Sequence, residues 1–222
     1  MRSLNLLTAL ALAATGFIGI HPAIAETSSS GSRAMPGYRI EMLGQTAPQP
    51  SSGAQVFLLK GLADIFSTGM DTLAARLQQR GVRPRIANHG AAYGFSDEVI
   101  RNYRAGARGP VIVVGHSFGA DAAVEFAQRL NEAKVPVALV ITFGPGASVK
   151  VPANVARAVN YYLTTGLWRG KLLPGPGFKG SIANVNLDNS QDVTHFNIEK
   201  IDRLQADTVS AVVAAAGRKK AN

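Results

Sequence analysis

The chain alternates short apolar runs with longer segments whose apolar residues recur at helical spacing. Continuous runs at 55–59, 111–114 and 135–143 are typical of strands buried on both faces of a parallel sheet. Shorter strand candidates lie at 82–87, 155–163 and 182–187, and predicted helices at 67–80, 96–103, 120–130 and 198–216. This alternation predicts an α/β fold: a mostly parallel, doubly wound sheet with helices on both faces, in a single domain.

The ends of the chain differ in composition from its middle. Residues 26–52 are rich in Ser, Gly and Pro and indicate a flexible lead-in, with a candidate edge strand at 38–43. Residues 53–217 are expected to form the domain, and 218–222 a basic tail. Repeated Gly and Pro residues between 166 and 177 predict a surface loop.

The first 25 residues have the pattern of a cleavable signal peptide. A positively charged start is followed by an apolar stretch, and Ala23 and Ala25 supply the small residues that a signal peptidase reads. The apolar stretch is short for a bilayer span, and no basic stop-transfer cluster follows it. We therefore expect cleavage after Ala25, a periplasmic or secreted mature protein, and no stable membrane span after cleavage.

The charge is strongly basic, with 23 Lys plus Arg against 14 Asp plus Glu. Basic residues are scattered along the chain and are not interleaved with aromatic residues, which favours a cationic surface over a nucleic-acid site. Cysteine is absent, which excludes disulfides, thiol nucleophiles and cysteine metal sites. No metal-binding, nucleotide-binding or flavin-binding motif is present, so we expect no cofactor.

One motif, Gly-His-Ser-Phe-Gly at 115–119, carries the chemistry. An apolar strand precedes it and an Ala-rich helical segment follows it. Strand, sharp turn and helix in this order form the nucleophile elbow of the α/β-hydrolase fold. The turn holds its serine in a strained conformation beside the N-terminus of the following helix. The sequence therefore predicts Ser117 as a nucleophile.

A serine nucleophile needs a base within hydrogen-bond reach. His195 fits best, because it follows the last predicted strand and matches the chain order serine, acid, histidine. His89 is the alternative base, although it precedes the serine. His116, inside the elbow, is expected to have a structural role.

The acid is less clearly marked than the other two groups. It should follow a late strand, but the strands that end at Phe143 and Leu163 carry no carboxylate there. Asp188 and Asp192 remain, both in the loop that carries His195. A serine–histidine dyad, with the histidine held by a backbone carbonyl, is the third alternative, because losing the acid slows a triad without abolishing its activity.

The oxyanion hole requires backbone N–H groups aimed at the developing charge. One is expected from Phe118, the residue after the nucleophile. The other is expected from the turn after the first buried strand, at Leu62 or Ala63.

Several segments resemble those of bacterial α/β-hydrolases of the lipase- or thioesterase-like kind. They are residues 56–67, 115–122, 151–155, 160–162 and 194–198. The resemblance implies Ser117 as nucleophile and His195 as base. Such relatives commonly carry Asp-Pro where this chain has Gly144-Pro145. If that Asp is their triad acid, this chain lacks it.

The residues thus support two hypotheses. The first is an exported serine hydrolase that cleaves a small-molecule ester or thioester through an acyl-enzyme on Ser117. The second is a non-catalytic or weakly active binding or envelope protein of the same fold, and Gly144 motivates it. Acyl chain, leaving group and oligomeric state have no signature in the sequence.

Overall fold

The computed structural model describes residues 53–62 and 67–217. Its main sheet has six strands in the order β2-β1-β3-β4-β6-β8, and every neighbouring pair is parallel. These strands are β1 (Gln55–Lys60), β2 (Arg85–Asn88), β3 (Val111–His116), β4 (Leu139–Phe143), β6 (Arg157–Tyr162) and β8 (Ser181–Asn186). Strands β5 (Val149–Val151) and β7 (Leu172–Pro174) form a separate two-stranded parallel sheet.

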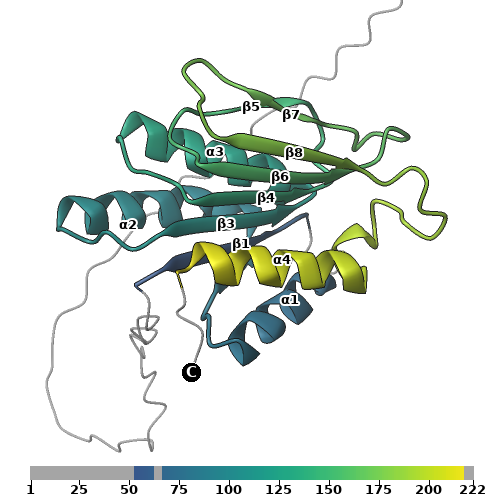
Figure 1. Ribbon diagram of the computed structural model, residues 1–222, viewed down its shortest axis with the longest axis horizontal. Coiled ribbons are helices and arrows are strands. Elements are labelled where there is room, and N and C mark those ends of the chain that lie inside the picture. Colours follow the sequence, from purple (N-terminus) through teal and green to yellow (C-terminus); the bar gives the residue numbers. More distant parts are fainter. Residues whose placement is uncertain (1–52, 63–66, 218–222) are drawn as a thin grey trace, which may run out of the picture. The chain divides into compact units, whose positions relative to one another are not determined.

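Helices cover both faces of the sheet (Figure 1). They are α1 (Thr68–Gln79), α2 (Ala92–Arg104), α3 (Phe118–Glu132) and α4 (Asp202–Ala215), with short 3-10 turns η1 (His89–Ala91) and η2 (Ile198–Lys200). Side chains alternate along β1, so that Leu58 packs in one core with α1 and α4, while Phe57 packs in another with α2 and α3. The predicted fold class is therefore confirmed.

Local structure differs from the expectation at several places. Helix α2 begins before Ser96, whose hydroxyl donates to the Tyr93 carbonyl inside the helix rather than capping it. The final helical segment is divided at Ile201, which is extended (φ −65°, ψ 119°). The predicted surface loop contains β7. Pairing with β5, distant in sequence, stabilises this strand, and local composition does not reveal it.

Some predictions fall outside the described residues: the signal peptide at 1–25, the edge strand at 38–43, Ala63 and the basic tail. Within the described part of the chain, no helix has the length and apolar character to cross a bilayer.

The strand order determines where a site can form. The chain passes from β1 to the edge strand β2 and then returns to β3 on the other side of β1. At this reversal the connections after β1 and β3 leave on opposite faces, which opens a crevice at the carboxyl ends of the two strands. The predicted elbow lies directly after β3.

Candidate active site

Ser117 occupies a strained turn between β3 and α3. Its backbone has φ 58° and ψ −126°, a conformation that a non-glycine residue rarely adopts. Two glycines make this turn possible. A Cβ on Gly115 would lie 1.9 Å from the Gly119 carbonyl oxygen, and a Cβ on Gly119 would lie 2.0 Å from the Leu59 oxygen. The motif therefore has the geometry of a nucleophile elbow.

The structure brings His195 to this serine. The imidazole Nε2 lies 3.1 Å from the Ser117 Oγ, although 78 positions separate the two residues. The His195 ring stacks on Trp168 on one side (centroids 4.4 Å apart, 9° between planes) and on His116 on the other (5.1 Å, 29°). Two aromatic faces thus fix the plane of the base.

Burial lowers the pKa of His195. Desolvation, followed by the neighbouring His116, lowers the pKa of His195 to about 4. The imidazole is therefore neutral at neutral pH, as a base that accepts a serine proton must be.

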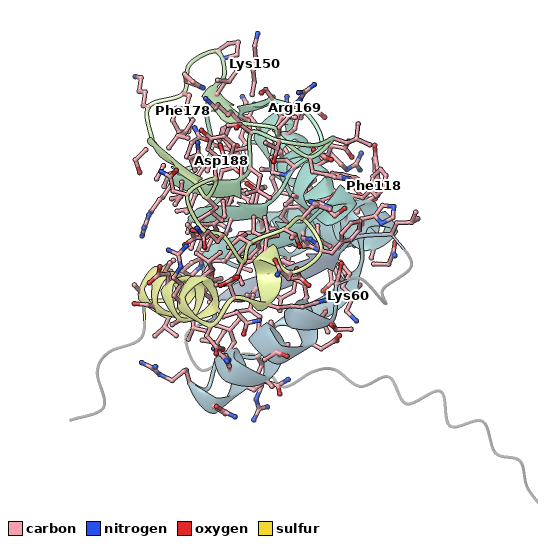
Figure 2. The ribbon with its side chains drawn as sticks, turned by 90° about the vertical axis from the view of Figure 1, so that its right-hand side faces the viewer. Lys60, Phe118, Lys150, Arg169, Phe178 and Asp188 are labelled. Atoms are coloured by element: carbon pink, nitrogen blue, oxygen red, sulfur yellow. The ribbon has the colours of Figure 1, made fainter. Side chains whose placement is uncertain are left out.

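Neither predicted acid contacts this imidazole. The exposed carboxylate of Asp188 accepts hydrogen bonds from the backbone N–H and the hydroxyl of Thr164, and these bonds lower its pKa. Asp188 therefore stabilises the turn after β6. Figure 2 faces the carboxyl edge of the sheet and labels both Asp188 and Phe118.

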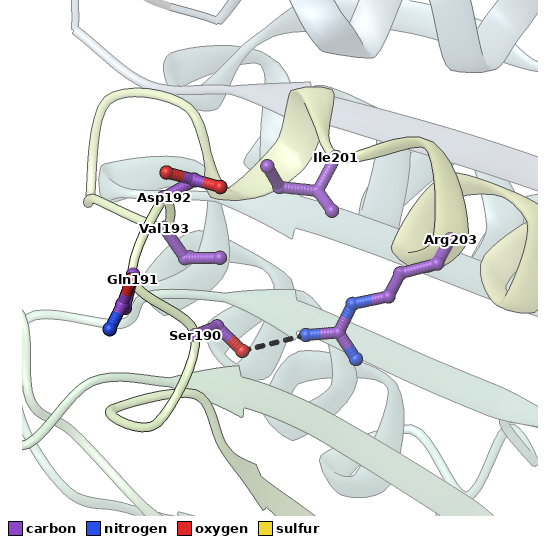
Figure 3. Close-up of a pocket in the computed structure, with 6 residues that line it drawn as sticks. All are labelled: Ser190, Gln191, Asp192, Val193, Ile201 and Arg203. Carbon is purple, nitrogen blue, oxygen red and sulfur yellow. Dashed lines mark hydrogen bonds between the residues drawn. The ribbon is translucent and has the colours of Figure 1, made fainter.

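Asp192 lies in a different cavity. That cavity has a volume of about 400 Å³, and Ser190 and Arg203, which are hydrogen-bonded to each other, also line it (Figure 3). The backbone carbonyl of Asp192 accepts a hydrogen bond from the side-chain amide of Asn197, the residue directly before η2. Asp192 thus belongs to the turn that shapes the His195 loop, and its carboxylate is not bonded to the ring.

The Nδ1 atom of His195 is buried and has no hydrogen-bond partner among the described residues. Gly144, with φ +58°, faces this atom, and a Cβ built on it would lie 2.8 Å from Nδ1. The position where related sequences are expected to carry the acid is therefore occupied by a glycine that packs against the imidazole edge. Of the alternatives left open by the sequence, the described geometry is nearest to a serine–histidine dyad, but no backbone carbonyl of the described residues holds the His195 ring at Nδ1.

His116 has the structural role expected of it. Its side chain is completely buried, with Nδ1 2.9 Å from the Ser67 hydroxyl and Nε2 3.0 Å from the backbone carbonyl of His195. The Ser67 hydroxyl in turn accepts the Gly61 N–H at 2.9 Å. Burial lowers the pKa of His116 to about 4, so this ring is neutral as well.

Glu199 is a buried carboxylate beside the same ring. It is 1% exposed, and its Oε2 lies 3.5 Å from the His116 Nε2. Burial raises its pKa to about 7, and the nearby Lys200 ammonium and backbone N–H groups offset part of this increase. His89, the alternative base, begins η1, and its ring contacts the ring of Phe118.

The expected oxyanion donors lie at the same place. Phe118 is the first residue of α3, so its N–H belongs to the positive end of the helix dipole. Leu62 follows β1, whose last residue Lys60 is labelled with Phe118 in Figure 2. Leu62 and Phe118 both line the cavity at Ser117.

This cavity has a volume of about 220 Å³ and a mainly apolar lining. Four large apolar or aromatic side chains, Leu62, Phe118, Trp168 and Phe196, surround the Ser117–His195 pair. Three of them are substantially exposed: Leu62 and Phe196 at 60% each, and Phe118 at 42%. An apolar group could therefore enter from solvent and lie against them.

Three residues of this arrangement were not found from the sequence. Trp168, the only tryptophan of the chain, lies in a Gly- and Pro-rich segment, and its isolation there was the available signal. Ser67 lies at the start of the predicted helix 67–80, where a serine is an ordinary helix cap, so its bond to His116 has no signal in the sequence. Glu199 follows the His195 segment closely, but only its complete burial distinguishes it from a surface carboxylate.

The sequence matches no protein-family model, and no curated protein is detectably similar to it in sequence. In structure the chain is similar to Est1E from Butyrivibrio proteoclasticus, with 8% identity, 78% of this chain and 92% of that chain covered, and a TM-score of 0.49. It is also similar to human thioesterase 2, with 10% identity, coverage of 76% and 98%, and a TM-score of 0.46. A third similar structure is the NocB thioesterase domain from the nocardicin cluster, with 14% identity, coverage of 75% and 95%, and a TM-score of 0.45.

The parallel sheet, the helices on both faces and the strained serine between β3 and α3 define the chain's class as the α/β-hydrolase fold. This assignment rests on the geometry of the chain itself.

Proposed function

We propose that this protein is a serine hydrolase that cleaves an ester or thioester through an acyl-enzyme on Ser117. The observation that carries the proposal is the 3.1 Å contact between the Ser117 Oγ on its strained turn and the His195 Nε2. In the same proposal the protein is exported. Export rests on residues 1–25, which lie outside the described residues.

In the proposed reaction the Ser117 Oγ attacks the acyl carbonyl and its proton passes to the His195 Nε2. The N–H groups of Phe118 and Leu62 stabilise the negative charge that develops on the carbonyl oxygen. The C–O or C–S bond then breaks, and the alcohol or thiol leaves with the proton from His195. Water, deprotonated by the same imidazole, releases the acid and restores Ser117.

The bare Nδ1 of His195 is expected to make this reaction slow. With no acceptor at Nδ1, the resting imidazole is more stable with its proton on Nε2, which donates to Ser117. Accepting the serine proton requires a buried Nδ1–H without a partner, which costs about 1–3 kcal/mol. The proposal is therefore a dyad enzyme with a modest kcat.

The cavity favours a short, apolar acyl group. Its volume of about 220 Å³ lies below the roughly 300–1,000 Å³ typical of sites for drug-sized ligands. Trp168 and Phe118 contact each other edge to face, with centroids 4.9 Å apart, and present apolar surface toward Ser117. Short-chain esters and thioesters are therefore the substrates to assay first.

A fluorophosphonate probe tests the nucleophile. We expect the wild-type protein to be labelled and to hydrolyse short-chain esters, and Ser117→Ala to lose both properties. His195→Ala is expected to keep the fold and to lower labelling and turnover roughly 100-fold or more, because general base catalysis contributes about 10²–10⁴-fold. Labelling that persists in Ser117→Ala would remove Ser117 from the proposal.

One observation favours the second candidate, a non-catalytic binding protein that retains the elbow. It is the buried Nδ1 of His195, which no acceptor from residues 53–62 or 67–217 contacts. A wild-type protein that is neither labelled nor active on any short-chain ester or thioester would support this candidate instead.

A further inference from the structure

A hydrogen-bonded chain of buried groups connects two separate loops of the site. It runs from Gly61, in the turn after β1, through Ser67 and His116 to the backbone carbonyl of His195. Its three hydrogen bonds are 2.9, 2.9 and 3.0 Å long. Ser67 and His116 are both 0% exposed, so no solvent competes for these bonds.

The direction of every bond in this chain is determined. A carbonyl oxygen only accepts, so the His116 Nε2 carries the proton and donates to His195. The neutral His116 ring then has its lone pair on Nδ1, which accepts the Ser67 hydroxyl proton. The Ser67 oxygen remains free to accept the Gly61 N–H. Each group therefore has one compatible role.

Through these hydrogen bonds, the His116 imidazole is connected to the nucleophile, to the base and to the oxyanion turn. His116 precedes the nucleophile Ser117 directly. Its Nε2 holds the carbonyl of the base, His195, and its ring stacks on the ring of that base. Its Nδ1, through Ser67, holds Gly61, the neighbour of the expected oxyanion residue Leu62.

Glu199 stabilises the tautomer of His116 that this series of hydrogen bonds requires. Its Oε2 lies 3.5 Å from the His116 Nε2. Among the described residues, no side chain donates a hydrogen bond to either oxygen of this carboxylate. Above its pKa of about 7, Glu199 carries a negative charge, and a negative charge facing an N–H favours the tautomer with the proton on Nε2 over the one with the proton on Nδ1. The other charged group that faces Glu199 is Lys200, with its Nζ 3.8 Å from Oε1.

We propose that Ser67, His116 and Glu199 are positioning residues that fix the base and the oxyanion turn relative to Ser117, a role that no acid among the described residues fills at His195. The need for such a device follows from the bare Nδ1 of His195, which lacks the hydrogen bond by which an acid orients its base. The inference rests on the proposed function, because positioning has meaning only if Ser117 reacts.

The experiment compares two buried serines that each donate and accept one side-chain hydrogen bond. Ser67→Ala removes the link between Gly61 and His116. Ser96→Ala is the matched control: its hydroxyl is also 0% exposed, donates to the Tyr93 carbonyl and accepts the Arg129 Nε–H, but lies in α2. Both variants lose a buried hydroxyl with two hydrogen bonds, so a difference in kcat isolates the positioning effect.

For Ser67→Ala we expect kcat to fall roughly 10- to 100-fold while KM changes less than about twofold, because misplacement of reacting groups acts on the chemical step. Ser96→Ala is expected to keep the wild-type kcat. Ser67→Thr retains the hydroxyl and is expected to recover kcat to within about threefold of wild type. A kcat for Ser67→Ala equal to that of Ser96→Ala would overturn the proposal.

Glu199→Gln provides a second variant with nearly unchanged shape. At about pH 8.5, where Glu199 is ionised, we expect a fall in kcat of about tenfold with KM unchanged, because the charge that favours the Nε2–H tautomer is lost. ¹⁵N NMR of the imidazoles reports the tautomer directly. In the wild type the His116 Nε2 is expected to be protonated and Nδ1 bare, and in Glu199→Gln this preference is weaker. An unchanged kcat together with an unchanged His116 tautomer would show that Glu199 is not a positioning residue.

Failure of the proposed function has a different signature. In that case the wild-type protein itself is not labelled by the fluorophosphonate probe and turns over no ester or thioester. If the wild type is labelled and active while Ser67→Ala and Glu199→Gln retain full kcat, the proposed hydrolase function is supported and the proposed positioning roles are wrong.

Discussion

Gly144 determines the chemical character of the site at the scale of a single residue. It faces the His195 Nδ1 where an acid would be expected, and its left-handed φ of +58° is a conformation that disfavours residues with a side chain. The imidazole edge packs directly against it. Gly144 thus helps to determine where the His195 imidazole lies.

Adding a side chain at this position is expected to lower activity. In Gly144→Ala the new Cβ lies 2.8 Å from the His195 Nδ1, so the ring must move from Ser117, with a loss in kcat of roughly 100-fold. Gly144→Asp begins with the same Cβ contact and is expected to be no more active. Steady-state kinetics on a short-chain ester measures both effects.

Gly106→Ala is the matched control for backbone strain. Gly106 also has a positive φ, +103°, but a Cβ there would meet nothing within 4 Å. We expect this variant to lose stability and keep its kcat. A Gly144→Asp enzyme faster than wild type would show that the ring has room for an acid, contrary to the described packing.

At the same scale, the sequence identified some residues and not others. Ser117 could be predicted because its signal is local: two glycines and the flanking elements stand within ten positions. His195 could be predicted from chain order. The role of Asp188 could not, because its Thr164 partner lies 24 positions away and no local pattern announces the contact.

Among the secondary-structure elements, the approach of α3 to β1 and β3 decides whether the elbow forms. The helix begins immediately after Ser117, and its Gly119 backbone packs against the Leu59 carbonyl of β1. Only a residue without a Cβ permits this distance. The close approach also places the N-terminus of α3 beside the serine.

Gly119→Ala is therefore expected to destabilise the protein by about 3 kcal/mol or more, because its Cβ would lie 2.0 Å from the Leu59 oxygen. Gly94→Ala is the control within a helix: nothing lies within 4 Å of its Cβ position in α2. That change is expected to stabilise by about 0.5–1 kcal/mol. Urea denaturation measures both, and a Gly119→Ala protein as stable as wild type would contradict the described packing.

The order of the main-sheet strands and the helices was predictable, but strand β7 and the break at Ile201 were not. Strand β7 was missed because its pairing with β5 links residues more than twenty positions apart. The break at Ile201 was missed because residues 198–216 have continuous helical periodicity. There the chain turns from η2 into α4, and the backbone of Glu199 accepts a hydrogen bond from Gln205.

At the scale of the whole molecule, the buried ionisable groups make the free energy of unfolding depend on pH. His116 and His195 have lowered pKa values of about 4, and Glu199 has a raised pKa of about 7. For Glu199 the unfolded chain releases its proton first as the pH rises. Between about pH 4.5 and pH 7 Glu199 therefore keeps more of its proton in the folded state, and its contribution to the free energy of unfolding falls as the pH increases. The two histidines contribute in the opposite direction between about pH 4 and pH 6.5, because the unfolded chain binds their protons more tightly.

Glu199→Gln is expected to remove this loss. Relative to wild type, the variant should gain on the order of 3 kcal/mol of stability between about pH 5 and about pH 8.5. Over this pH range both histidines are neutral in the folded proteins, since their pKa values are about 4, and they titrate alike in the two unfolded chains. Their effect therefore cancels in the difference. Chemical denaturation at the two pH values measures it. An equal difference at both pH values would show that Glu199 ionises as freely when folded as when unfolded.

The sequence by itself determined the alternation of strands and helices, the parallel sheet and the serine elbow. It could do so because apolar periodicity and glycine spacing act over neighbouring residues. Only the tertiary structure decided what surrounds His195: Trp168 on its face, Gly144 at its Nδ1, and the Ser67–His116–Glu199 group behind it. These contacts join residues 27 to 83 positions apart in different elements. Their energies depend on burial and orientation, which exist only after the sheet has assembled.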